Sequence, residues 1–81
     1  MYYVYFLKNQ KNDDLYIGST ENLDDRVALH NAGRVKATKF YRPWQLVGFE
    51  EYNSRDEAVR RERFLKTGQQ KEILKRKYMA W

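Results

Sequence analysis

Two ionic side chains, Arg26 and Glu62, interrupt the apolar stripes of two predicted helices. A charge turned toward a core is costly unless it is paired or binds a metal. The spacing leaves two interpretations open: a structural role, as a salt bridge across the core or as side chains extended to its rim, or a role in an active site. The stripes have helical spacing and comprise Leu23, Arg26, Val27 and His30 in the first helix and Ala58, Glu62 and Leu65 in the second.

These residue types together fit the hydrolysis of a phosphodiester. Arginine can bind a phosphate through two hydrogen bonds, glutamate can hold a divalent cation, and a strand tyrosine such as Tyr16 could take a proton from water. Considered singly, Tyr16 is more typical of a core aromatic and His30 of an ordinary helix histidine. A single histidine and no cysteine exclude the usual zinc sites. The chain also has no P-loop, dinucleotide-binding glycine motif or serine nucleophile elbow.

The elements that would position these side chains follow the order β-β-α-β-α-α. Aromatic and β-branched residues at 2–7 predict a central strand, paired as a hairpin with a second strand at 15–18. Asn22 is a good N-cap for the first helix, and Ser54 with Glu57 matches a capping box for the second. This order favours an α+β fold, with a three-stranded antiparallel sheet flanked by three helices. The other predicted elements are helix 23–31, strand 44–52, helix 55–66 and helix 69–78, the last with Ile73, Leu74 and Tyr78 turned to the core.

Composition predicts one folded domain over residues 1–81. Hydrophobic residues at 42% and aromatic residues at 16% are too frequent for a disordered chain. The net charge of +5 favours a polyanionic partner such as nucleic acid, although charge alone is weak support. The absence of cysteine fits a reducing compartment, and no apolar run approaches the roughly 20 residues of a spanning helix or has the pattern of a signal peptide. We therefore expect a cytoplasmic protein.

A basic segment, residues 34–42, is a candidate nucleic-acid contact. It has four cations and no carboxylate, with two aromatic residues between the cations. Cations contact phosphates and aromatic rings stack on bases, a combination suited to single strands or distorted duplexes. An ordinary solvated loop is the alternative. The candidate contacts are Arg34, Lys36, Lys39, Phe40, Tyr41 and Arg42; a second basic cluster, Lys71, Lys75, Arg76 and Lys77, is more typical of a solvated helix face.

The chain resembles the GIY-YIG nuclease family over almost its whole length. The resemblance rests on Tyr3-Val4-Tyr5, on Tyr16-Ile17-Gly18, on Arg26 and His30 in one helix, and on Glu62 in a later one. The stretch from 15 to 30 (LYIGSTENLDDRVALH) is its most specific part. Two further stretches, KATKFYRPW at 36–44 and RRERFLKTG at 60–68, resemble a small stand-alone bacterial subgroup.

This resemblance implies a fold, an activity and roles for five residues. The fold is a three-stranded antiparallel sheet flanked by helices, and the activity is that of a metal-dependent endonuclease. Tyr16 would be the general base or proton relay that activates water, supported by Tyr5. Arg26 would stabilise the pentavalent phosphate with His30 nearby, and Glu62 would hold a single Mg²⁺ or Mn²⁺.

The resemblance also implies the partner. Family members include homing endonucleases, restriction enzymes and the incision subunit of bacterial nucleotide excision repair, so DNA is expected in preference to RNA, and DNA repair is an expected context. We expect a monomer that has no membrane partner. Because the printed sequence has no attached DNA-reading domain, we expect low sequence specificity.

Two departures from the family pattern define alternative functions. The first triad has Val4 where the family has glycine, and no asparagine follows Glu62, where many members carry one that helps to organise the site. The main alternative is a nucleic-acid-binding module that keeps the nuclease scaffold and cuts little or nothing. A protein-interaction domain that uses exposed aromatic residues such as Trp81 is the third.

Overall fold

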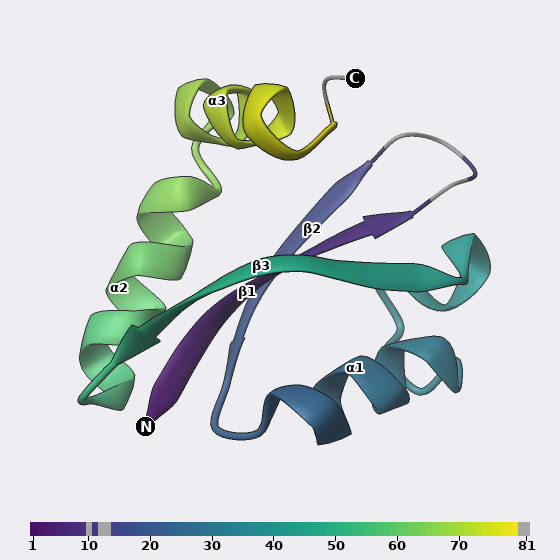
Figure 1. The fold of residues 1–81 in the computed structure, drawn as a ribbon, viewed down its shortest axis with the longest axis horizontal. Helices are drawn as coiled ribbons and strands as arrows, with labels where there is room; N and C mark the ends of the chain where they lie inside the picture. Colours follow the sequence, from purple (N-terminus) through teal and green to yellow (C-terminus); the bar gives the residue numbers. More distant parts are fainter. Residues whose placement is uncertain (10, 12–13, 80–81) are drawn as a thin grey trace.

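The computed structural model describes residues 1–9, 11 and 14–79, and it has the predicted α+β architecture. Three antiparallel strands form one sheet in the order β2-β1-β3, so the aromatic first strand is central as predicted. The predicted element order is confirmed, with one short 3-10 helix added (Figure 1). The elements are β1 (Tyr2–Asn9), β2 (Leu15–Thr20), α1 (Leu23–Asn31), η1 (Lys39–Tyr41), β3 (Trp44–Tyr52), α2 (Arg55–Leu65) and α3 (Gly68–Met79).

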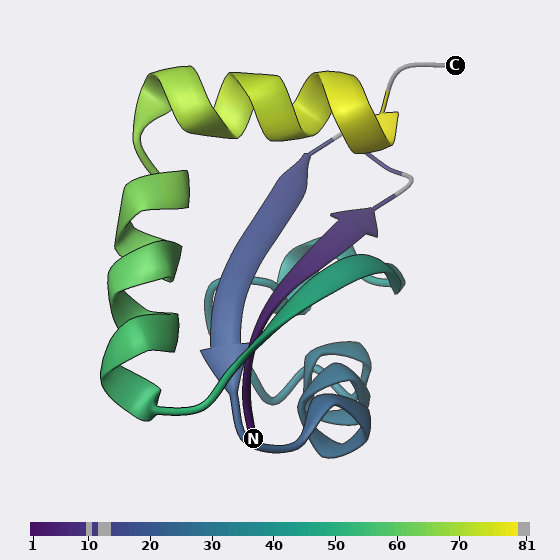
Figure 2. The same cartoon turned by 60° about the vertical axis from the view of Figure 1, so that its left-hand side comes forward.

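The helices cover opposite faces of the sheet. Figures 1 and 2 show α1 on one side and α2 with α3 on the other. Alternation along β1 divides its side chains between two cores, because successive residues in a strand point to opposite faces. The core under α2 and α3 contains Val4, Phe6, Leu15, Ile17, Ala58, Leu65 and Leu74; the core under α1 contains Tyr5, Leu7 and Trp44, with Tyr16, Leu23, Val27 and Leu46 packed against it.

Helix starts follow the predicted capping residues. The Asn22 side chain accepts a hydrogen bond from the Asp25 backbone N–H at 3.1 Å, and the Ser54 hydroxyl accepts one from the Glu57 N–H at 3.2 Å. Each bond satisfies a backbone donor that the helix leaves without an internal partner. These two caps fix where α1 and α2 begin, and therefore help to fix the positions of Arg26 and Glu62.

One predicted core position was wrong. Ile73 is 51% exposed, whereas Leu74 is 9% exposed and Tyr78 is half-buried. Residues i and i+4 share a helix face, so Leu74 and Tyr78 lie on one stripe, while Ile73 is turned about 100° from Leu74. Trp81, the candidate anchor for a protein partner, lies outside the described residues. None of the helices in the described ranges is long and apolar enough to cross a membrane.

Candidate active site

Four of the predicted site residues meet on the α1 face of the sheet. Tyr5 lies in the middle of β1, and Tyr16 lies on β2, where it is opposite Leu7 in the strand register. Arg26 and His30 are four residues apart in α1, so they project from one helix face toward these strands. The apolar stripe of α1 therefore faces the sheet as predicted. Arg26 and His30 belong to this stripe, so they face the sheet as well.

Hydrogen bonds join three of these side chains. The Tyr5 hydroxyl lies 2.8 Å from Nε2 of His30, and Nε of Arg26 donates to the same hydroxyl at 3.3 Å. The Tyr16 ring packs edge-on against the His30 ring, with centroids 4.9 Å apart. Tyr5 and His30 are fully buried, whereas Tyr16 and Arg26 are half-buried. The buried pair thus forms a floor, and the Tyr16 and Arg26 side chains are partly open to solvent above it.

Burial determines the protonation states of Tyr5 and His30. Loss of solvent raises the pKa of the Tyr5 phenol to about 12, outweighing the hydrogen bond from Arg26, which lowers it. Burial, followed by the positive charge of Arg26, lowers the pKa of His30 to about 4. The hydrogen bond to Tyr5 raises the pKa of Arg26. Near neutral pH the site therefore combines a cationic arginine with a neutral phenol and a neutral imidazole.

Glu62 reaches the site from the opposite face of the sheet. Its Oε1 accepts a hydrogen bond from the Ser19 hydroxyl at 2.6 Å, and its Oε2 pairs with Nζ of Lys66 at 2.7 Å. The same ammonium lies 5.7 Å from the centroid of the Tyr16 ring. Because β2 is an edge strand, Lys66 can extend around it from α2 to the α1 face. The Glu62 charge also raises the pKa of Tyr5, after burial and the Tyr16 contribution.

The five predicted catalytic positions thus gather around β2. The structure contradicts a salt bridge between Arg26 and Glu62, since Arg26 donates to Tyr5 while Glu62 pairs with Lys66. Ser19 and Lys66 were missed by sequence reasoning. Lys66 had a visible signal, since it lies four residues after Glu62 on the same helix, whereas the Ser19 contact spans 43 residues and has no local signature.

The donor atoms at Glu62 fit a hard divalent cation. Carboxylate and hydroxyl oxygens suit Mg²⁺, which often binds through one or two carboxylates and completes its shell with water and substrate phosphates. Residues 1–9, 11 and 14–79 contain no group of three or more histidine, cysteine, aspartate or glutamate side chains that could hold a metal without such help. A cation at Glu62 would compete with Nζ of Lys66 for Oε2. A bound phosphate would offer the displaced ammonium another anion, so cation and phosphate would fit best together.

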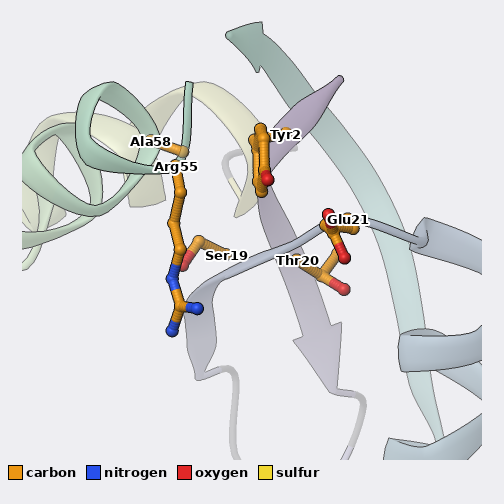
Figure 3. Close-up of a pocket in the computed structure, with 6 residues that line it drawn as sticks. All are labelled: Tyr2, Ser19, Thr20, Glu21, Arg55 and Ala58. Atoms are coloured by element: carbon orange, nitrogen blue, oxygen red, sulfur yellow. The ribbon is translucent and has the colours of Figure 1, made fainter. Parts of the chain in front are cut away.

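A polar cavity adjoins the Glu62 position. It has a volume of about 270 Å³ and lies between the end of β2 and the start of α2. Figure 3 shows the Arg55 guanidinium beside Ser19, with the Glu21 carboxylate across from it next to Thr20. The two opposite charges make this cavity an unsuitable site for a phosphate alone. The lining residues are Tyr2, Ser19, Thr20, Glu21, Arg55 and Ala58.

All six candidate contacts of the basic segment are exposed. Phe40 is the most open large apolar side chain of the described chain, at 74% exposure, and Nζ of Lys39 lies 4.9 Å from its ring centroid. A cavity of about 420 Å³ lies between this segment, Lys11 and Asn31. The exposed residues are Arg34, Lys36, Lys39, Phe40, Tyr41 and Arg42. In the second basic cluster, by contrast, Lys71 and Lys75 lie 3.6 and 3.8 Å from Oδ1 of Asp14.

The glycine of the second triad makes room for Tyr5. Gly18 is opposite Tyr5 in the register, and a Cβ added to it would lie 2.5 Å from the Tyr5 hydroxyl oxygen. We expect Gly18→Ala to destabilise the fold by about 1–3 kcal/mol, because a buried ring must shift. Urea unfolding measures this, with Gly68→Ala as the control, because a Cβ there has no atom within 4 Å. Equal effects of the two substitutions would contradict the packing argument.

Stability should depend on the protonation of His30. Since its pKa is about 4 folded and about 6.5 unfolded, the unfolded chain binds the extra proton between these values. Stability is therefore lost as the pH falls below 6.5, by up to about 1.4 kcal/mol per pH unit. Urea unfolding at pH 7 and pH 5 should show a clear loss in the parent protein and a smaller one in His30→Gln. Parallel changes in the two proteins would refute the assignment.

Comparison with known proteins places the chain in a family. The profile of the GIY-YIG catalytic domain matches residues 1–78, and the chain belongs to this family. Its relatives include UPF0213 proteins of Staphylococcus haemolyticus, 45% identical over 91% of this chain and 90% of the relative, and of Clostridium perfringens, 43% identical over 82% and 71%. A solution structure of a UPF0213 protein from Bacillus halodurans is similar with a TM-score of 0.56 and 35% identity, over 91% of this chain and 82% of that one. The resemblance to small bacterial members is confirmed, and membership supports a nuclease-type function.

Proposed function

We propose that the protein is a metal-dependent endonuclease that hydrolyses phosphodiester bonds in DNA with low sequence specificity. The observation that carries the proposal is the meeting of a phosphate-binding cation, a partly open phenol and a carboxylate around one strand. These are Arg26, Tyr16 and Glu62, brought to β2 from α1, β2 itself and α2. Membership of the GIY-YIG family is independent support for this chemistry.

Each side chain has a part in the proposed reaction. Water attacks phosphorus and forms a P–O bond, while the bond from phosphorus to the leaving sugar oxygen breaks. Tyr16 takes up the proton lost by the water, the leaving sugar oxygen takes a proton from solvent, and Arg26 stabilises the charge that develops on the phosphate oxygens. Tyr5 and His30 hold Arg26 in place through the Tyr5 hydroxyl. A divalent cation held by Glu62 would supply Lewis-acid neutralisation of the phosphate.

The basic segment is the proposed contact for the DNA strand. Its exposed cations can bind phosphates, and Phe40 and Tyr41 offer rings on which bases can stack. Both kinds of contact are independent of base identity, which supports low sequence specificity.

Cleavage of DNA with and without metal tests the proposal directly. Single-stranded, duplex and branched DNA would be incubated with the protein in Mg²⁺, Mn²⁺ or EDTA. We expect cutting with either metal and none in EDTA. Salt-sensitive DNA binding without cutting in any condition would contradict the nuclease proposal and favour the alternative, a binding module on a nuclease scaffold.

Binding through the basic segment should depend steeply on salt. Each phosphate contact on a single strand contributes about −0.7 to the slope of log K against log salt, so removing two cations should reduce the magnitude of that slope by about 1.4. We expect this for the double variant Lys36→Ala and Lys39→Ala in anisotropy titrations with a fluorescent single strand. The control is Arg76→Ala with Lys77→Ala on α3, two exposed cations of the second cluster. A larger effect of the α3 pair would move the contact away from the segment.

A further inference from the structure

A buried threonine connects the basic segment to the candidate active site. Thr38 is fully buried although its side chain is polar, and its hydroxyl lies 2.7 Å from Nδ1 of His30. His30 is buried to the same degree, and its other ring nitrogen contacts Tyr5. A chain of hydrogen bonds therefore runs from the segment, through one imidazole and one phenol, to Arg26.

The hydrogen-bond partners of Thr38 determine which atom donates and which accepts at each step of this series of hydrogen bonds. The Thr38 hydroxyl donates to the carbonyl of Val35 at 3.4 Å, so its oxygen is available as the acceptor from His30. Nδ1 of His30 must then carry the ring proton, since a neutral imidazole has one donor and one acceptor nitrogen. Nε2 is left as the acceptor, and the Tyr5 hydroxyl donates to it. The phenol oxygen then accepts from Nε of Arg26 without competition.

The backbone of Thr38 is fixed equally firmly. Its carbonyl accepts hydrogen bonds from the Trp44 indole N–H at 2.9 Å and from the Tyr41 N–H at 3.1 Å. Trp44 is 5% exposed and belongs to the core under α1. Thr38 lies between Lys36 and Lys39, so it is an inward-facing residue of a segment whose charged neighbours face solvent.

We propose that Thr38 is a positioning residue of the candidate active site, whose hydroxyl holds His30 in the Nδ1–H tautomer and thereby orients Tyr5 to accept from Arg26. The effect on cleavage rests on the proposed nuclease function, whereas the tautomer and the Arg26 contact do not. Loss of the hydroxyl frees the imidazole to change tautomer. In the other tautomer the Nε2–H of His30 donates to the Tyr5 oxygen and competes there with Nε of Arg26.

The single histidine of the chain makes the tautomer directly measurable. In protein labelled with ¹⁵N-histidine, long-range ¹H–¹⁵N spectra at neutral pH separate the protonated nitrogen from the bare one. We expect the Nδ1–H form in the parent protein and in Thr38→Ser, and loss of that form in Thr38→Val. An Nε2–H tautomer in the parent protein would overturn the proposal, even if Thr38→Val fails to fold.

The Arg26 contact provides a readout that does not need activity. Exchange of the Arg26 Nε–H with solvent should be faster in Thr38→Val and unchanged in Thr38→Ser. Thr67→Val is the matched control, since its hydroxyl also donates to a backbone carbonyl, that of Phe64, but Thr67 is exposed in the turn between α2 and α3. Unchanged Arg26 exchange in Thr38→Val would overturn the positioning role.

Cleavage then tests the consequence. If the parent protein cuts DNA, we expect Thr38→Val to cut about 10–100-fold more slowly, with binding of a single strand nearly unchanged and the rate restored by serine. Full activity of Thr38→Val would contradict the proposal. A parent protein that does not cut, but has the Nδ1–H tautomer and the Thr38-dependent Arg26 contact, would contradict the nuclease function and support the positioning role of Thr38.

Discussion

Replacing Glu62 by glutamine is expected to lower metal-dependent cleavage by about 10³-fold or more. Lewis-acid stabilisation of a phosphate is worth several kcal/mol, and each 1.36 kcal/mol is about a factor of ten in rate. Glutamine keeps an oxygen that can accept from Ser19, but it loses the charge that pairs with Lys66 and would hold the cation. Titration with Mn²⁺ should accordingly shift amide signals around Glu62 in the parent protein and not in the variant.

A matched control exists on the other edge of the sheet. Glu50 on β3 is a partly buried carboxylate that also pairs with a cation of α2, Arg61, at 3.0 Å. Arg61 and a hydrogen bond from Tyr52 hold the pKa of Glu50 below its usual value, although burial acts in the opposite direction. Glu50→Gln should therefore cost stability through a lost ion pair while cleavage persists. Similar cleavage by Glu50→Gln and Glu62→Gln would remove the special role from Glu62.

The second large effect is expected at Tyr16. Loss of a proton relay costs typically about 10²–10⁴-fold in rate, so Tyr16→Phe should nearly abolish cleavage. Its stability should change little, since the side chain is half-buried and its ring contacts with His30 and Trp44 persist in phenylalanine. Rates of cutting and urea midpoints, measured on the same samples, separate the two effects.

For Tyr5→Phe we expect the reverse: a larger loss of stability and a smaller loss of cleavage rate than for Tyr16→Phe. It leaves the buried Nε2 of His30 without its hydrogen-bond partner, at a cost of about 1–3 kcal/mol in stability. Its effect on cleavage arises only through the looser Arg26. Tyr41→Phe, on the exposed 3-10 helix, is a control expected to leave stability unchanged. If Tyr5→Phe abolished cleavage while Tyr16→Phe retained it, the two tyrosines would exchange roles.

The fold could be predicted from sequence because its elements have strong local signals. The aromatic run of β1 required burial on both faces, and Asn22 and Ser54 marked helix starts through contacts within three residues. The orientation of α3 lacked such a signal. Its apolar residues Ile73 and Leu74 are neighbours in sequence and point in different directions, so tertiary packing decides which of them contacts the sheet, and Ile73 was misplaced.

The candidate site was predictable only in part for the same reason. Arg26 and Glu62 stand out because each is an ion on an otherwise apolar helix stripe. Thr38 has no such contrast with its neighbours, and its importance arises from a contact with His30 that only the folded chain creates. Ser19 is a similar case. In sequence it is only a hydroxyl after a glycine, and its contact with the Glu62 carboxylate exists only once α2 packs on the sheet.

The position of the candidate site on an edge strand has a consequence for self-assembly. Exposed sheet edges are open to pairing with a strand of another molecule. A strand added to β2 would run beside Tyr16 and through the path by which Lys66 reaches around from α2. If the candidate site is where DNA binds, a strand added at this edge would cover it. Under the proposed function, an assembly that extends the sheet and still cuts would therefore have to grow from β3.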